Sequence, residues 1–176
     1  DIFHHWKNFP CSPAPAKKVL TKNCRNTRTI VNYLNETYPT GMTHFDASPV
    51  GAPVSIRSTK NDVDEQTQIV RDVKQLITVD KVPPGSIVIL LNSDKRDSCL
   101  KETKAIAGFP LQSTYERYDP KARAVYYSQI DIFKGLEADV VLVALGPTLV
   151  SDATPKALYV QGSRAKHVLF IYRHEG

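Results

Sequence analysis

The segment 133–143 reads Phe-Lys-Gly-Leu-Glu-Ala-Asp-Val-Val-Leu-Val and joins a polar turn to an apolar run. Lys134 and Gly135 are typical of a tight turn, because glycine readily adopts positive φ angles. The apolar residues after Glu137 are typical of a parallel strand that is covered on both faces. The segment therefore predicts a turn followed directly by a buried strand over residues 138–145.

Other parts of the chain repeat this alternation of strand and helix. The segment 86–91 is a second continuous apolar run after a Pro-Pro-Gly turn, and Asp62 with Glu65 forms a capping-box pattern before apolar residues at helical spacing. Further strands are predicted at 17–20, 54–57, 124–130 and 167–172. Further helices are predicted after a cap at Asn26 or Thr27 with an end at Gly41, from Arg96 to Ala107, and from Thr154-Pro155 to Arg164.

Strands that alternate with helices indicate βαβ units, and hence an α/β fold with a mainly parallel sheet and helices on both faces. In such folds ligands gather at the carboxyl edge of the sheet. We therefore expect the functional residues at that edge.

The composition indicates one domain without a membrane span. Residues 1–16 contain three prolines and no periodicity, which favours an arm or linker, and residues 17–176 form the expected domain. The chain has no apolar run of about 20 residues and no secretory signal, so a cytoplasmic protein without a membrane partner is expected.

The charged and metal-binding residue types give weaker indications. Lys and Arg exceed Asp and Glu by 23 to 18, a surplus compatible with nucleic acid but common without it. Three cysteines without a Cys-x-x-Cys spacing argue against a disulfide framework or a zinc knuckle. His4, His5 and Cys11 could be imagined as metal ligands, but a polar arm is the favoured interpretation, and no metal site is predicted.

Two further segments accompany 133–143. Residues 158–167 read Leu-Tyr-Val-Gln-Gly-Ser-Arg-Ala-Lys-His and place Arg164 at the end of a short predicted helix. Residues 20–27 read Leu-Thr-Lys-Asn-Cys-Arg-Asn-Thr, a strand end and a turn that contains Arg25. In their order and spacing the three segments resemble motifs IV, V and VI of UvrD/Rep-type superfamily 1 helicases, and the resemblance covers residues 20–172.

The resemblance implies a three-layer RecA-like domain with the P-loop NTPase-like fold, the second of two domains that hold ATP and Mg²⁺ between them. No Gly-x-x-x-x-Gly-Lys-(Ser/Thr) phosphate loop occurs in the 176 residues. The implied partner is therefore an upstream ATP-binding domain of the same protein. The function implied is that of an ATP-dependent helicase or translocase, and the isolated chain is expected to be inactive.

The resemblance also assigns roles to single residues. Arg25 and Arg164 match the arginines that reach across the cleft to the γ-phosphate, a catalytic role suited to the forked guanidinium. Glu137 matches an acceptor for the ribose, beside Gly135 in the nucleotide site. Contacts to single-stranded nucleic acid, with DNA as the expected form, are implied for Lys134, Ser128 and Arg28.

Two departures from the family pattern favour other functions. Cys24 stands where many relatives have a tyrosine that stacks on adenine, and Asp131 stands where relatives commonly have a histidine near the nucleic-acid strand. These departures leave open a noncatalytic helicase-like adaptor that binds nucleic acid or protein. A self-contained enzyme that uses Glu137 or Asp139 as general base is the third alternative.

A basic loop is a further candidate for binding a single strand. Its charged members are Arg117, Lys121 and Arg123, and Tyr115 and Tyr118 lie between or beside them. A solvated loop before a strand explains the same residues equally well.

Overall fold

Five apolar residues in a row, Ile87–Leu91, form strand β4 in the middle of a seven-stranded sheet. A computed structural model describes residues 21–147 and 155–175 of the chain. All neighbouring strands are parallel except β5 and β6 at one edge. The sheet order is β3 (Ser55–Thr59), β9 (Ala165–His174), β8 (Ala138–Ala144), β4, β7 (Val125–Gln129), β6 (Phe109–Ser113) and β5 (Ala105–Ile106).

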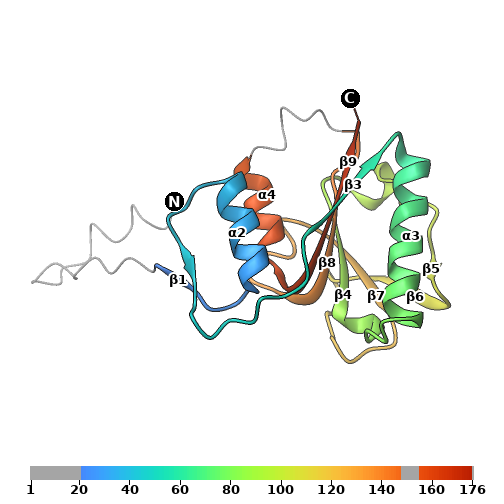
Figure 1. Cartoon of the computed structure of the whole chain (residues 1–176). Coiled ribbons are helices and arrows are strands. Elements are labelled where there is room, and N and C mark those ends of the chain that lie inside the picture. Colours follow the sequence, from blue (N-terminus) through green and yellow to red (C-terminus); the bar gives the residue numbers. More distant parts are fainter. Residues whose placement is uncertain (1–20, 148–154, 176) are drawn as a thin grey trace, which may run out of the picture.

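Helices cover both faces of this sheet. Helices α2 (Arg28–Thr37) and α4 (Pro155–Gly162) lie together on one face, and α3 (Asp62–Thr78) lies on the other (Figure 1). Successive residues of the central strands alternate between the two resulting cores, because side chains of a strand point to opposite faces. The α2/α4 core takes Val88, Leu90, Val141 and Val143, and the α3 core takes Ile87, Ile89, Leu91, Val140 and Leu142. The predicted α/β fold with a mainly parallel sheet is confirmed.

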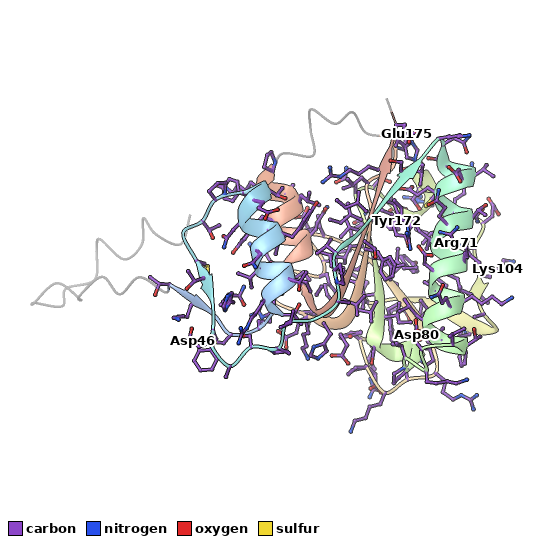
Figure 2. All side chains as sticks on the ribbon, in the orientation of Figure 1. Asp46, Arg71, Asp80, Lys104, Tyr172 and Glu175 are labelled. Carbon is purple, nitrogen blue, oxygen red and sulfur yellow. The ribbon has the colours of Figure 1, made fainter. Side chains whose placement is uncertain are left out.

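A buried carboxylate connects α3 to the sheet. Asp72 is 5% exposed, and its Oδ2 accepts a hydrogen bond of 2.9 Å from the hydroxyl of Tyr172 on β9. The guanidinium groups of Arg57 and Arg71 lie 3.1 and 3.2 Å from the same carboxylate. Figure 2 shows Tyr172 on the sheet and Arg71 on the facing helix. Burial and the adjacent Asp72 carboxylate raise the pKa of Tyr172 well above its ordinary value, so this phenol stays a hydrogen-bond donor.

The start of α3 differs from the predicted capping box. The cap is Asn61, whose side chain accepts a hydrogen bond from the backbone N–H of Asp64. Glu65 instead points into the protein, is 1% exposed, and accepts a hydrogen bond from the backbone N–H of Gly146. The prediction was wrong because asparagine is an equally good cap and lies one residue earlier.

The helix predicted from Arg96 to Ala107 is also wrong. Residues Lys95–Asp97 form one 3-10 turn, further turns follow, and β5 begins at Ala105. Ala107 has a φ of 53°, which an α-helix does not accept. The edge strands β5 and β6 were missed, because this segment has neither a long apolar run nor a regular alternation.

The N-terminal part forms a separate small sheet. Strands β1 (Lys22–Asn23) and β2 (Thr43–His44) pair in parallel on either side of α2 in the sequence. Helix α2 ends at Thr37, ahead of the predicted stop at Gly41. The predicted strand at 17–20, the predicted arm at 1–16 and the cap at Thr154 lie outside the described residues.

Candidate functional site

A tight turn between β1 and α2 carries Arg25. The side-chain oxygen of Asn23 accepts hydrogen bonds from the backbone N–H groups of Arg25 and Asn26, at 2.9 and 3.1 Å. The side chain of Asn26 is 2% exposed and donates hydrogen bonds to the backbone carbonyls of Ser163 and Ala165. Asn26 therefore fixes the Arg25 turn against the segment that contains Arg164.

Glu137 and Arg164 precede neighbouring strands. Ala138 pairs with Ala165 in the parallel ladder of β8 and β9, and the N–H of Ala138 donates to the carbonyl of Arg164 at 3.1 Å. The two residues that precede these strands consequently lie side by side. Arg25, Glu137 and Arg164, which are far apart in the sequence, are brought to one place.

These three residues line one open cleft of about 770 Å³. Glu137 makes an ion pair with Arg25 at 2.8 Å and another with Lys166 at 3.2 Å. Four cationic side chains and one carboxylate line the cleft, so its lining has a positive excess that suits an anionic ligand. The lining residues are Lys22, Asn23, Cys24, Arg25, Asn26, Met42, Glu137, Tyr159, Ser163, Arg164 and Lys166.

The guanidinium of Arg164 is held at the wall of this cleft. Its Nε donates to the carbonyl of Val160 at 3.2 Å, and an Nη donates to the carbonyl of Leu136 at 3.5 Å. Partial burial, and then the nearby charge of Arg25, lower the pKa of Arg164. Two like charges that face one cleft are unfavourable on their own and favour a bound anion between them.

The cleft lies at the other edge of the sheet from the one predicted. Glu137 comes directly before β8 and Arg164 directly before β9, so both are at the amino ends of parallel strands. The connection 130–137 returns from the carboxyl end of β7 to the amino edge without forming a helix. The expectation of a site at the carboxyl edge was wrong, because the turn before a strand carries the residues here.

The Lys134-Gly135 turn is placed next to the cleft but outside its lining. Gly135 has a φ of 88°, as predicted for a tight turn, and the N–H of Leu136 donates to the carbonyl of Phe133 at 3.1 Å. Lys134 is exposed. Gly135 thus shapes the approach of the chain to Glu137, and its predicted place in a nucleotide site stays a prediction.

Ser128 and Arg28 are tied into the protein. Ser128 is 2% exposed, accepts a hydrogen bond from the hydroxyl of Thr114 at 2.7 Å, and donates to the carbonyl of Gln129. A side chain this buried does not offer the predicted nucleic-acid contact. Arg28 is half-buried and donates to the backbone carbonyls of Ser48 and Asp46, so its guanidinium holds the loop before β3.

The basic loop before β7 is only partly available as a strand-binding surface. Tyr118 packs edge-on against the rings of Tyr126 and Phe133, with ring centroids 5.2 and 5.6 Å away. Tyr115 is 78% exposed, and the guanidinium of Arg123 lies over the ring of Phe109. Tyr118 therefore belongs to the core, and Tyr115 is the aromatic side chain that solvent reaches.

The structure also places the remaining residues that the sequence analysis singled out. Cys24 is exposed and lines the cleft, and Asp131 is exposed on the connection before β8. Glu137 and Asp139, the candidates for a general base, both face Lys166, which lies 3.7 Å from Asp139. The possible ligands His4, His5 and Cys11 lie outside the described residues.

Lys166 and Tyr159 were missed as members of the site. Both lie within the segment that already contains Arg164. Tyr159 is on helix α4 and Lys166 is at the start of β9, and both side chains line the same cleft. The local pattern could have indicated Lys166, because residues two apart in a strand share a face. The contribution of Lys22 and Asn26 depends on the tertiary fold.

Comparison with known proteins gives a likeness of fold. No family model and no curated protein matches the chain. Among solved structures, the C-terminal domain of a possible DNA helicase from Lactobacillus plantarum WCFS1 is similar, with a TM-score of 0.64 and 21% identity over 85% of this chain and 86% of that one. The chain therefore shares the fold of that helicase domain over most of the length of both.

The described helices also bear on membrane association. None of those in residues 21–147 and 155–175 is long and apolar enough to cross a bilayer.

Proposed function

We propose that the chain is the C-terminal motor domain of an ATP-dependent nucleic-acid helicase or translocase of the UvrD/Rep type, with a RecA-like fold. The observation that carries the proposal is the convergence of Arg25 and Arg164 on one cationic cleft, in which Glu137 is ion-paired with Arg25. The three sequence motifs and the shared fold with a possible DNA helicase domain support it independently.

Within this proposal the cleft is one half of an ATP site. The triphosphate of ATP would supply the anionic ligand that the positive excess of this cleft suits, and a guanidinium can bind two phosphate oxygens at once. Glu137 would exchange its ion pair with Arg25 for a hydroxyl of the ribose. Mg²⁺ and the phosphate loop would belong to an upstream domain, since this cleft presents cations and a single carboxylate.

The test of the proposal compares this chain with a protein that also contains the ATP-binding domain. We expect the isolated 176-residue chain to show no ATP turnover, because it lacks a phosphate loop. The longer protein should hydrolyse ATP, and single-stranded DNA should stimulate that hydrolysis. Mg²⁺-dependent turnover by the highly purified isolated chain would contradict the proposal.

Binding of nucleic acid gives a second expected result. The isolated chain should bind single strands weakly and without sequence preference, because half a binding channel contacts few phosphates. With about three phosphates neutralised, log affinity should fall against log salt with a slope of about −2. Lys134→Ala should reduce that slope by about 0.7, since it removes one exposed cation.

The control for that variant is Lys104→Ala, which removes another exposed lysine from the segment before β5. Fluorescence anisotropy at a series of salt concentrations measures both slopes. If Lys104→Ala and Lys134→Ala change the slope equally, the binding reflects net charge rather than a defined path.

The alternative function is a helicase-like adaptor without catalysis. The observation that favours it is Cys24 in the lining of the cleft. A tyrosine at this place would stack on the adenine of ATP, and a cysteine cannot make that contact. Retention of both arginines favours the motor, and the substitutions described in the Discussion separate the two.

A further inference from the structure

Three ligand-type side chains meet at the carboxyl edge of the sheet, the edge opposite to the cationic cleft. Asp62 and Glu65 stand in the first turn of α3, and His174 is the last residue of β9. One carboxylate oxygen from each acid and the Nε2 of His174 all lie within 4.8 Å of one another. Arg164 directly precedes the same strand, so about 30 Å separates this cluster from the cleft at a rise of about 3.3 Å per residue.

The facing atoms of the cluster are buried without partners. Asp62 Oδ1, Glu65 Oε2 and His174 Nε2 are all enclosed by protein, and within residues 21–147 and 155–175 none has a hydrogen-bond partner. Glu65 is 1% exposed as a whole residue. Buried polar groups are almost always hydrogen-bonded, so three unsatisfied atoms that point at one another indicate a missing ligand.

The distances within the cluster fit a shared ion better than direct hydrogen bonds. His174 Nε2 lies 3.8 Å from Asp62 Oδ1 and 3.7 Å from Glu65 Oε2. A nitrogen-to-oxygen hydrogen bond is about 2.7–3.2 Å long, which is shorter than both. Two ligands that each lie about 2.1 Å from a tetrahedral metal ion are about 3.4 Å apart.

Neighbouring groups fix the orientation of the central carboxylate. The second oxygen of Glu65 accepts the N–H of Gly146 at 3.2 Å, which leaves Oε2 directed at the cluster. The buried thiol of Cys99 lies beside Glu65 as well. Metal-binding carboxylates commonly have such outer hydrogen bonds.

We propose that Asp62, Glu65 and His174 bind one divalent transition-metal ion, with Zn²⁺ as the best-fitting species. Two carboxylates balance the charge of the ion while the imidazole is neutral. The imidazole ligand and the set of three favour zinc over magnesium or calcium, which prefer oxygen ligands in greater number. Asp62, whose side chain is 47% exposed although its Oδ1 is enclosed, is the ligand nearest the surface, and a water would be the fourth ligand.

The ion would join two parts of the fold that are distant in the sequence. It would bind the first turn of α3 to the end of β9, next to the loop at Gly146 that follows β8. The site is therefore a structural clamp at the carboxyl edge. It does not depend on the proposed motor function.

The experiment uses the 176-residue chain after removal of metal with a chelator. Calorimetric titration with Zn²⁺ should show one site, and a free Zn²⁺ concentration a hundred times its Kd should raise the Tm by at least about 5 °C. Mg²⁺ at the same concentration should leave the Tm unchanged. To remove the ligands of the N-terminal arm, both measurements are repeated with His4→Ala, His5→Ala and Cys11→Ser combined, which should retain the site.

Substitution of the ligands distinguishes this site from chance binding. Glu65→Gln and His174→Gln should each weaken Zn²⁺ binding at least about tenfold and abolish the rise in Tm. Asp62→Asn, at the exposed rim, keeps the test informative if the buried variants fail to fold. The matched controls are Glu36→Gln and His167→Gln, which change exposed residues and should bind Zn²⁺ like the parent.

Two results would overturn the proposal. The first is the absence of a stoichiometric Zn²⁺ site in the arm-substituted chain. The second is unchanged Zn²⁺ affinity in Asp62→Asn and His174→Gln. Either result would leave His174 beside two carboxylates without a bound ion.

Discussion

If the proposed motor function is right, replacing Arg164 by alanine in a longer protein that also carries the proposed ATP-binding domain should lower kcat for ATP hydrolysis by at least about 10²-fold. The guanidinium is held at the wall of the cleft by the carbonyls of Val160 and Leu136, so its position in the lining is fixed before a ligand binds. If it stabilises the charge that develops in transfer, its loss affects the transition state more than the bound nucleotide. The KM for ATP should therefore change much less than kcat.

Lysine should rescue this function poorly. Arg164→Lys keeps a positive charge but loses the planar fork that binds two oxygens, so its kcat should lie closer to that of alanine than to that of the parent. Steady-state ATPase assays with single-stranded DNA measure these values, and circular dichroism confirms that each variant is folded.

The matched control is Arg96→Ala, which removes an arginine whose side chain is 87% exposed and whose recorded partner is Asp94. Its kcat should equal that of the parent. Arg25→Ala should resemble Arg164→Ala, because both guanidinium groups line the same cleft. DNA-stimulated hydrolysis that survives both Arg25→Ala and Arg164→Ala would favour the adaptor.

Replacing Asp72 by alanine should lower the free energy of unfolding by about 3 kcal/mol. The substitution leaves the buried hydroxyl of Tyr172 without its acceptor and separates Arg57 and Arg71 from their shared carboxylate. Both arginines are partly exposed, so solvent screens their ion pairs with Asp72 and these pairs contribute little to stability. The loss of the hydrogen bond from Tyr172 therefore accounts for most of the change. Urea denaturation followed by circular dichroism measures the change.

Two comparisons test this explanation. Asp72→Asn retains an acceptor for Tyr172 and should lose less than alanine does. Asp80→Ala removes an exposed carboxylate just after α3 and should change stability by less than about 0.5 kcal/mol. Equal losses in Asp72→Ala and Asp80→Ala would show that the buried carboxylate has no special role.

The sequence predicted the central strands better than the periphery. The runs 86–91 and 138–145 differ from β4 and β8 by one residue at one end, because strands buried on both faces must be apolar throughout. The segment 96–107 was mistaken for a helix, because short edge strands and turns depend on packing with β7 and α3 rather than on a local pattern.

The sequence predicted which residues form the cleft but not where in the fold the cleft lies. The three motifs selected Arg25, Glu137 and Arg164, which the structure brings together. The predicted edge of the sheet was wrong. The general rule for α/β folds concerns the turns that follow strands, whereas Glu137 and Arg164 lie in turns that precede strands. The carboxyl-edge cluster was not predicted, because His174 is distant in the sequence from Asp62 and Glu65.

The two arginines of the cleft are held by two different sheets, and we expect these sheets to unfold locally at different rates. Arg164 directly precedes β9, a ten-residue strand of the main sheet that pairs with β8 and, from Phe170 onward, also with β3. Arg25 follows β1, a two-residue strand in a sheet of two. Amide hydrogen exchange should therefore be slow along β9 and fast through β1 and β2. We expect the wall at β9 to open only with the main sheet and the wall at β1 to open locally, while Asn26 joins the two walls through its hydrogen bonds to the carbonyls of Ser163 and Ala165.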